Sequence, residues 1–376
     1  MENVRNKQFE ILLVLAISFV VMGHAWVDIG TLQYVFPYDS FHMPLFMFIS
    51  GYFFNKKYIE NGTLNFVKKQ ILTLLIPFFV LNLLYGIIAV FLWKIYYVNW
   101  VSGHDFINKV FIRPFTYGNT FFGLNDATWY ILMFFEVKIA DHLLKKFLYK
   151  YKIQDIAVLI IYLVVSAFAV TYSRSTDKLP VEFSIIRILY MLFWYQTGYI
   201  YKQYVEKHDT LNNFTFFSVV IFFQFCIKIY SGDERMTAGI WNATFDQNAF
   251  ITILAATNGI AFFLRLSRIL VPLHNTCITY ISKHTFSIMA NHMLGFFLLN
   301  IILLKTCHYW GIGNFDMVSF KNSLWYRYLP CDLNSFRVVF VLWGMIFSLL
   351  LALLYEKIKN YLTSLCRSRK IETESE

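Results

Sequence analysis

Residues 71–93 read ILTLLIPFFVLNLLYGIIAVFLW and contain no charged side chain. A helix of this length extends about 34 Å, enough to cross the roughly 30 Å hydrocarbon core of a bilayer. The whole chain of 376 residues is 58% hydrophobic, 20% aromatic and only 15% charged. Soluble domains are about 25% charged, so these charges are too few to cover a water-exposed surface. The sequence therefore predicts an integral membrane protein and excludes disordered and fibrous classes.

Nine further apolar runs accompany this one. Two of the ten are unusual, because 37–54 is short and contains Pro44 and Gly51, and 128–145 contains several charged residues. The sequence predicts an all-α, polytopic bundle of about ten transmembrane helices over residues 1–361, followed by a disordered cytoplasmic tail at 362–376. The ten predicted spans are 9–28, 37–54, 71–93, 128–145, 156–172, 184–201, 214–231, 249–264, 285–304 and 336–355.

The basic residues predict the orientation of the bundle. The net charge is +10, and most Lys and Arg residues lie at the N-terminus, in alternate connections between spans and in the C-terminal tail. Cytoplasmic loops carry such an excess, so both termini are predicted to be cytoplasmic and the first span to be uncleaved. Because the charges form small clusters between spans and no continuous patch, nucleic-acid binding is not expected.

Four histidines lie within predicted spans, and three of them are candidate catalytic residues, namely His24, His42 and His292. Ionisable side chains are costly in lipid and mark functional sites, and imidazole is suited to take a proton from a hydroxyl group. The alternative for each is a hydrogen bond between helices or a position at the membrane interface. The predicted topology places His24 and His42 in the outer half of the bilayer and His292 nearer the midplane.

Other residues are candidates to line a substrate pocket. Arg187 is suited to an anionic lipid-linked phosphate, although snorkelling towards lipid headgroups is the alternative. Ser50 precedes Gly51, a pair that allows close helix approach. Trp129 and Asn291 are the remaining pocket candidates. No His or Cys group has the spacing of a metal site, so no metal is predicted.

Cys307 and Cys331 both fall in the last predicted outer loop. An oxidising compartment would let them pair. The sequence leaves a disulfide and two free thiols as alternatives.

Six stretches, in order along the chain, identify a family resemblance. The chain resembles the acyltransferase 3 family of ten-span membrane O-acyltransferases, in particular its fucose 4-O-acetylase-like branch. It departs from the family pattern in the first span, where Leu13 replaces the Arg of many members and Glu10 stands in the place of an Asp. The stretches are Phe9 to His24, His42 to Tyr52, Phe66 to Pro77, Trp129 to Leu132, Arg187 to Tyr199 and Ser282 to His292.

The resemblance implies an enzyme of a bacterial cell membrane that moves an acetyl or longer acyl group from cytoplasmic acetyl-CoA to a sugar hydroxyl. The acceptor would be a cell-surface polysaccharide or its lipid-linked precursor, and no cofactor would be bound permanently. His24 would be the general base or would carry the acetyl group transiently. The alternatives are an exporter of a glycan or small solute, or a scaffold for glycan synthesis. The CoA phosphates would meet a group of cytoplasmic lysines, called here the inner lysines: Lys56, Lys57, Lys68 and Lys69.

Overall fold

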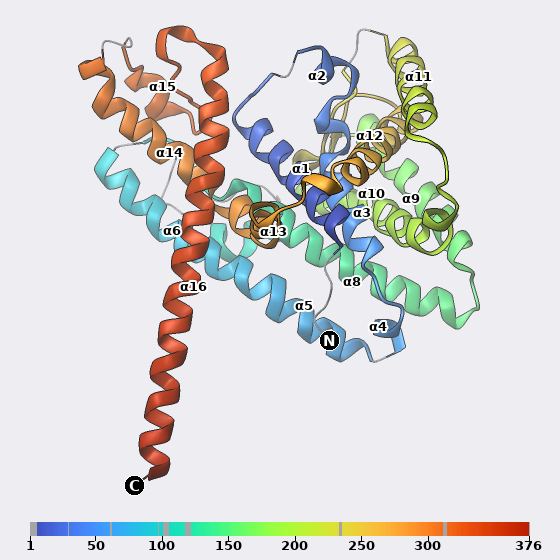
Figure 1. The fold of residues 1–376 in the computed structure, drawn as a ribbon, viewed down its shortest axis with the longest axis horizontal. Helices are drawn as coiled ribbons and strands as arrows, with labels where there is room; N and C mark the ends of the chain where they lie inside the picture. Colours follow the sequence, from blue (N-terminus) through green and yellow to red (C-terminus); the bar gives the residue numbers. More distant parts are fainter. Residues whose placement is uncertain are drawn as a thin grey trace.

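In the computed structural model the chain is almost entirely α-helical (Figure 1). The structure describes residues 6–28, 30–60, 62–96, 98–100, 105–116, 122–232, 235–310 and 314–375. A short hairpin pairs β1 (Ala238–Gly239) with β2 (Thr244–Phe245) in antiparallel register. The helices are α1 (Lys7–His24), α2 (Thr31–Val35), α3 (Tyr38–Tyr52), α4 (Lys57–Glu60), α5 (Thr63–Gln70), α6 (Ile76–Tyr96), α7 (Arg113–Thr116), α8 (Trp129–Lys150), α9 (Asp155–Ser175), α10 (Pro180–Ile200), α11 (Asn213–Ser231), α12 (Ala249–Ile269), α13 (Thr276–Lys283), α14 (Thr285–Trp310), α15 (Met317–Asn322) and α16 (Arg337–Ser375).

Seven helical segments in the described part of the chain are long and apolar enough to cross a membrane. They confirm an all-α, multi-pass membrane protein. Each of the ten predicted spans coincides with a helix, and the three outside the seven correspond to α3, α8 and α10. The exact number of spans and the side on which the termini lie remain predictions. The seven segments are Lys7–His24, Thr63–Ile95, Asp155–Ser175, Asn213–Ser231, Ala249–Ile269, Thr285–Cys307 and Asn334–Tyr361.

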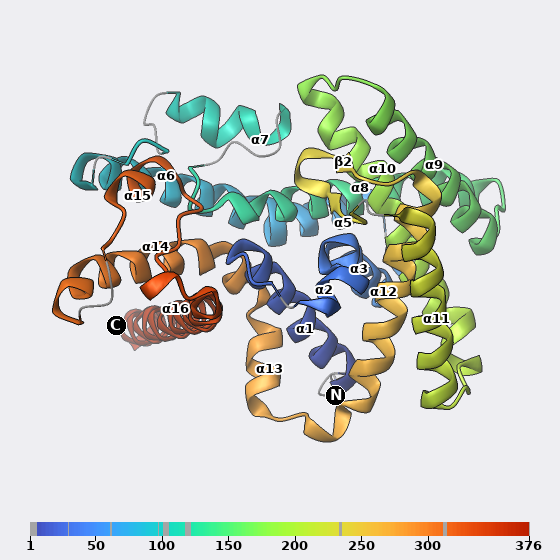
Figure 2. The same ribbon diagram turned by 90° about the horizontal axis from the view of Figure 1, so that it is seen from above.

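Two of these three less apolar helices, α3 and α10, form the inner part of the bundle. α10 packs along α3 and α9 and also contacts α8. Most residues of α3 and α10 are buried by protein, and in Figure 2 α3 lies among the other helices. A helix that is surrounded by protein needs no continuous lipid-facing surface, so it tolerates polar residues that a lipid-exposed helix excludes.

Two glycines allow α3 and α10 to cross at backbone contact. A Cβ atom added to Gly51 would collide with the carbonyl group of Tyr195, and one added to Gly198 would collide with the carbonyl group of Phe48. Small residues at a crossing let helix backbones approach closely, which confirms the close approach predicted for Gly51.

The C-terminal helix α16 packs against α14 over the first part of its length. In Figure 1 the rest of α16 extends beyond the other helices as far as the C-terminus. The helix is described as far as Ser375, and no Gly or Pro follows Gly344 to end it earlier. The disorder of the cytoplasmic tail at 362–376 remains a prediction.

The two cysteines of the last predicted outer loop do not form a disulfide. Cys307 is buried and Cys331 is exposed, and both are free thiols. The buried Cys307 donates a weak hydrogen bond to the carbonyl oxygen of Leu304, 3.5 Å away. Of the two alternatives that the sequence left open, the structure has the free thiols.

Candidate active site

His24 and His292 meet, although 268 residues separate them in the sequence. Nδ1 of His24 lies 2.6 Å from Nε2 of His292, and the two rings are nearly parallel, with an angle of 12° between their planes. His24 is the last residue of α1, and His292 lies in the first half of α14, which packs against α1. His292 is completely buried, whereas His24 is half-buried. The structure thus joins two of the three predicted catalytic residues.

The hydrogen bonds of this pair fix which ring nitrogens carry protons. Nδ1 of His292 lies 2.7 Å from the carbonyl oxygen of Ile288. A carbonyl oxygen only accepts, so Nδ1 of His292 is the donor and, in the neutral ring, Nε2 is the acceptor. Nδ1 of His24 therefore donates to His292, which leaves the lone pair of His24 on Nε2. This is the arrangement of a base whose orientation is set by a second group.

A tight reversal of the chain ends α1 directly after His24. The N–H of Trp26 bonds to the carbonyl oxygen of Gly23, and the N–H of Val27 bonds to that of Met22. This is the Schellman arrangement, which requires one residue in the left-handed region. Trp26 occupies it with a φ of 57°, a conformation that usually favours glycine. The reversal holds His24 at the very end of the helix, where its ring is accessible on one side.

Arg327 connects the loop before α16 to this site, and the sequence alone did not identify it. Its guanidinium donates to the carbonyl oxygens of Leu324 and Tyr326 and, over 3.0 Å, to that of His24. The group is buried against the Phe296 ring, 4.6 Å from the ring centre, and burial lowers its pKa to about 9. In the described residues it forms no ion pair with a carboxylate. A positive charge therefore lies beside the histidine pair and is not neutralised by a carboxylate.

Trp325, two residues before Arg327, packs its ring against His24 at a centre-to-centre distance of 5.6 Å. It also meets the exposed Trp26 ring edge to face. The signal that points to these loop residues is the run Trp325-Tyr-Arg-Tyr328, an arginine among aromatic side chains in a predicted outer loop. Such a run is too common at membrane interfaces to identify a site without the fold.

His42 lies in the first turns of α3, near the same end of the bundle. Its Nδ1 is 2.7 Å from the carbonyl oxygen of Tyr38, which accepts from it, and His42 is near enough to His24 for their charges to interact. The Tyr38 ring packs beside Gly23, and the Asp39 carboxylate is close to both Gly23 and His42. The structure therefore gathers all three predicted histidines and adds Asp39, which the sequence did not single out.

Two of the predicted pocket residues, Ser50 and Asn291, lie on α3 and α14, and the other two lie on α8 and α10. Trp129 and the buried Arg187 face each other, with the guanidinium 5.7 Å from the indole ring centre. Ser50 bonds to Tyr195 at the crossing of α3 and α10. The Asn291 amide accepts from Tyr85 over 2.6 Å and donates to Ser287, so it points away from its neighbour His292. Substrate contacts for these four residues remain predictions.

The inner lysines lie at the opposite end of α1 and α3 from His24, which is called here the inner end. All four have exposed side chains, and they follow α3 or lie in α4 and α5. Lys56 pairs with Asp155 at 3.5 Å and lies over the Tyr149 ring, and Lys69 contacts Tyr58. Their role towards the CoA phosphates remains a prediction.

Glu10, which stands in the place of an Asp in the family pattern, also lies at the inner end. Its carboxylate accepts from Thr279 over 2.8 Å and lies 2.7 Å from Nε2 of His274. Leu13, which stands where many family members have an Arg, packs against the hydrophobic core. The chain thus fixes the start of α1 through α13 and the turn before it.

No curated protein and no solved structure is detectably similar to this chain. A family model described as an acyltransferase domain matches residues 6–357, which include every element of the site described above. The chain therefore belongs to the acyltransferase 3 family and is a multi-pass membrane acyltransferase.

Proposed function

We propose that this protein transfers an acetyl group from cytoplasmic acetyl-CoA to a sugar hydroxyl of a cell-surface polysaccharide or its lipid-linked precursor. The observation that supports this most strongly is the contact between His24 and His292, which leaves Nε2 of His24 as a base at the end of a buried hydrogen-bonded pair. The family assignment supplies the acyl transfer; the acetyl donor and the sugar acceptor belong to the proposal.

In the proposed reaction His24 takes the proton of the acceptor hydroxyl on Nε2. The hydroxyl oxygen attacks the thioester carbonyl, a C–O bond forms, and the C–S bond then breaks. The imidazolium returns its proton to the departing sulfur, so the products are the acetyl ester and CoA with a free thiol. His292 accepts a hydrogen bond from the imidazolium and thereby stabilises it.

Arg327 supplies a positive charge for the negative charge that develops on the carbonyl oxygen. Its guanidinium is buried beside His24 and forms no ion pair in the described residues, so it is already desolvated before the reaction begins. A preorganised charge in a site of low dielectric stabilises a developing oxyanion more than water does. Trp26 and Trp325 are partly exposed beside the same site and offer apolar rings to a sugar.

The two ends of the bundle would serve the two substrates. α1 has 18 residues and is therefore about 27 Å long, and the inner lysines lie near its start while His24 lies at its end. The phosphates of CoA would bind at the inner lysines, and the pantetheine arm would enter the bundle towards His24. The acceptor would reach His24 from the opposite side, next to Trp26 and Trp325.

Transfer of radiolabelled acetyl from acetyl-CoA to polysaccharide isolated from the source cells tests this function, together with release of free CoA thiol. The wild-type protein is expected to give both products, and His24→Ala is expected to give neither at an equal protein level. His208→Ala is the matched control, because His208 is an exposed histidine far along the chain from the site. Full acetylation by His24→Ala would exclude the base assignment, and the absence of CoA release with every acceptor would favour transport.

A further inference from the structure

A second site lies at the inner end of the bundle, away from the histidine pair. Helices α3, α9, α10, α11 and α12 line a partly open cavity of about 370 Å³. This volume is within the range of ligand pockets, which is about 300 to 1,000 Å³. Apolar cavities do not hold ordered water, so an apolar space of this size in a membrane protein is expected to hold a ligand.

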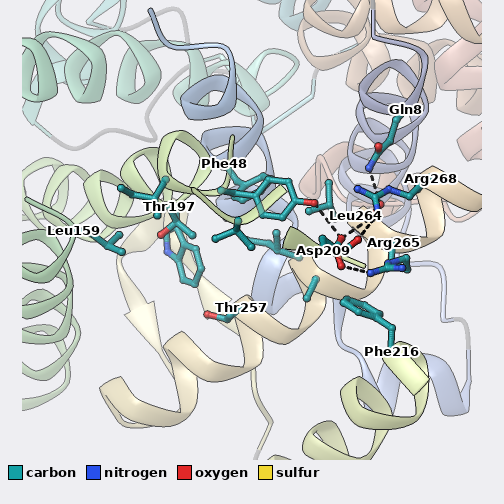
Figure 3. A pocket seen from close by; sticks show the side chains of 16 residues that line it. Gln8, Phe48, Leu159, Thr197, Asp209, Phe216, Thr257, Leu264, Arg265 and Arg268 are labelled. Carbon is teal, nitrogen blue, oxygen red and sulfur yellow. Dashed lines mark hydrogen bonds and ion pairs between the residues drawn. The ribbon is translucent and has the colours of Figure 1, made fainter. Parts of the chain in front are cut away.

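The lining of the cavity is divided into an apolar end and a charged end (Figure 3). Leu159, Thr197 and Thr257 lie at one end, and Asp209, Arg265 and Arg268 lie at the other. The hydroxyl groups of Thr197 and Thr257 bond back to the carbonyl oxygens of Phe193 and Ile253 in their own helices. Apart from the indole N–H of Trp194, the deep end therefore offers almost no hydrogen bonds to a ligand, which suits a hydrocarbon chain.

The charged end has a net positive charge. Asp209 pairs with Arg265 and, at 3.2 Å, with NH1 of Arg268, so one carboxylate faces two guanidinium groups. Arg265 is buried, and its Nε has no acceptor among the described residues. Arg268 is about a third exposed, and its contacts to Asp209 use NH1 alone. Its other N–H groups are available to an anion such as a phosphate.

The length of the cavity matches one leaflet of a bilayer. Thr257 and Arg268 are eleven residues apart on α12, which is about 16 Å along the helix. Half of the hydrocarbon core is about 15 Å thick. A lipid chain with its phosphate at Arg268 would therefore extend to the depth of Thr257.

We propose that this cavity binds one acyl chain of an anionic membrane lipid, whose phosphate Arg268 holds. The pantetheine arm of CoA fits the lining less well, because its amide groups would be buried without partners. The cavity is separate from the candidate active site at His24. Gln8 lines its rim and lies 16 residues, or about 24 Å, before His24 on α1.

Thermal unfolding of the purified full-length protein in one neutral detergent tests the proposal. Five probes are compared: palmitoyl lysophosphatidylglycerol, palmitoyl lysophosphatidylcholine, glycerol phosphate, palmitoyl-CoA and CoA alone. A ligand that binds only the folded protein raises the melting temperature. The anionic lysolipid is expected to raise it by several degrees, the zwitterionic lysolipid by less, and glycerol phosphate not at all. A larger shift with palmitoyl-CoA, accompanied by a shift with CoA alone, would overturn the lipid assignment and indicate a donor site.

Two variants locate the binding. Thr257→Trp fills the deep end and is expected to abolish the shift, while Phe250→Trp, at a 65% exposed position of the same helix outside the cavity, is expected to retain it. Arg268→Gln leaves the cavity open. It is expected to weaken the affinity for the anionic lysolipid about tenfold, to that for the zwitterionic lysolipid. An unchanged shift in Thr257→Trp, or undiminished preference for the anionic lysolipid in Arg268→Gln, would overturn the proposal.

Discussion

The histidine pair allows a quantitative prediction for His292→Phe. The phenyl ring keeps the shape of the buried side chain but removes the acceptor for Nδ1–H of His24, which lies 2.6 Å away in the wild type. A hydrogen bond to a group that becomes charged contributes about 1.5 to 3 kcal/mol. If that contribution is made in the transition state, its loss lowers kcat by about 10- to 150-fold. The KM for acetyl-CoA is expected to stay within about twofold, because the proposed site for the donor phosphates is at the inner lysines.

The assay is the rate of CoA release at saturating acceptor, measured with a thiol reagent over a range of acetyl-CoA concentrations. His292→Gln provides the matched control, because its side-chain amide can accept from His24 and is expected to recover part of kcat. A thermal unfolding curve for each variant establishes that the protein is folded. A His292→Phe enzyme with a kcat within about twofold of wild type would refute the role of His292 as the orienting group.

Three further predictions follow from other contacts. Arg327→Ala is expected to lower kcat by at least about 100-fold, as the loss of an oxyanion donor does. Arg327→Lys is not expected to restore it, because a compact ammonium lacks the planar, forked geometry with which Arg327 reaches three carbonyl groups. CoA release by folded protein measures this, and activity restored by Lys would contradict it. Gly198→Ala is expected to destabilise the protein by about 3 kcal/mol or more, because the added Cβ would collide with the backbone of α3. Gly295→Ala is the control and is expected to cost less, because its added Cβ would lie 3.1 to 3.3 Å from the nearest atoms. Equal melting temperatures for the two variants would contradict the backbone contact. Replacing all four inner lysines by Gln is expected to raise the KM for acetyl-CoA about tenfold with little change in kcat. The rise in KM is expected to be larger at low salt, where charges are less screened. An unchanged KM would place the donor phosphates elsewhere.

The sequence predicted the helices well because their signal is local. A run of about 20 apolar residues is sufficient to identify a lipid-facing helix such as α6, and the ten runs all coincide with helices. The ends were less accurate: the first span was predicted to continue to residue 28, whereas α1 ends at His24. The reversal that ends it uses Trp26 in a left-handed conformation, and no sequence rule predicts a tryptophan in that role.

The site was predicted only in part, because its geometry depends on how the helices are rotated against each other. Each histidine was recognisable in its own span, but the contact between His24 and His292 requires the packing of α1 against α14. Arg327 lies in a loop whose sequence has no periodicity, so no pattern indicates that its side chain meets the C-terminal end of α1. Adjacent residues of a helix differ in direction by about 100°, which is why the Asn291 amide meets Tyr85 while its neighbour His292 meets His24.

The crossing at Gly51 and Gly198 limits how the bundle can change shape. Each glycine accommodates a carbonyl group of the other helix, so sliding α3 along α10 by one residue would bring Ser50 or Tyr199 side chains into spaces that admit only a hydrogen atom. α3 and α10 are therefore expected to move together as one rigid unit. Any conformational change that admits a bulky glycan to His24 must occur in the elements around α3 and α10, above all in the loop that contains Trp325 and Arg327.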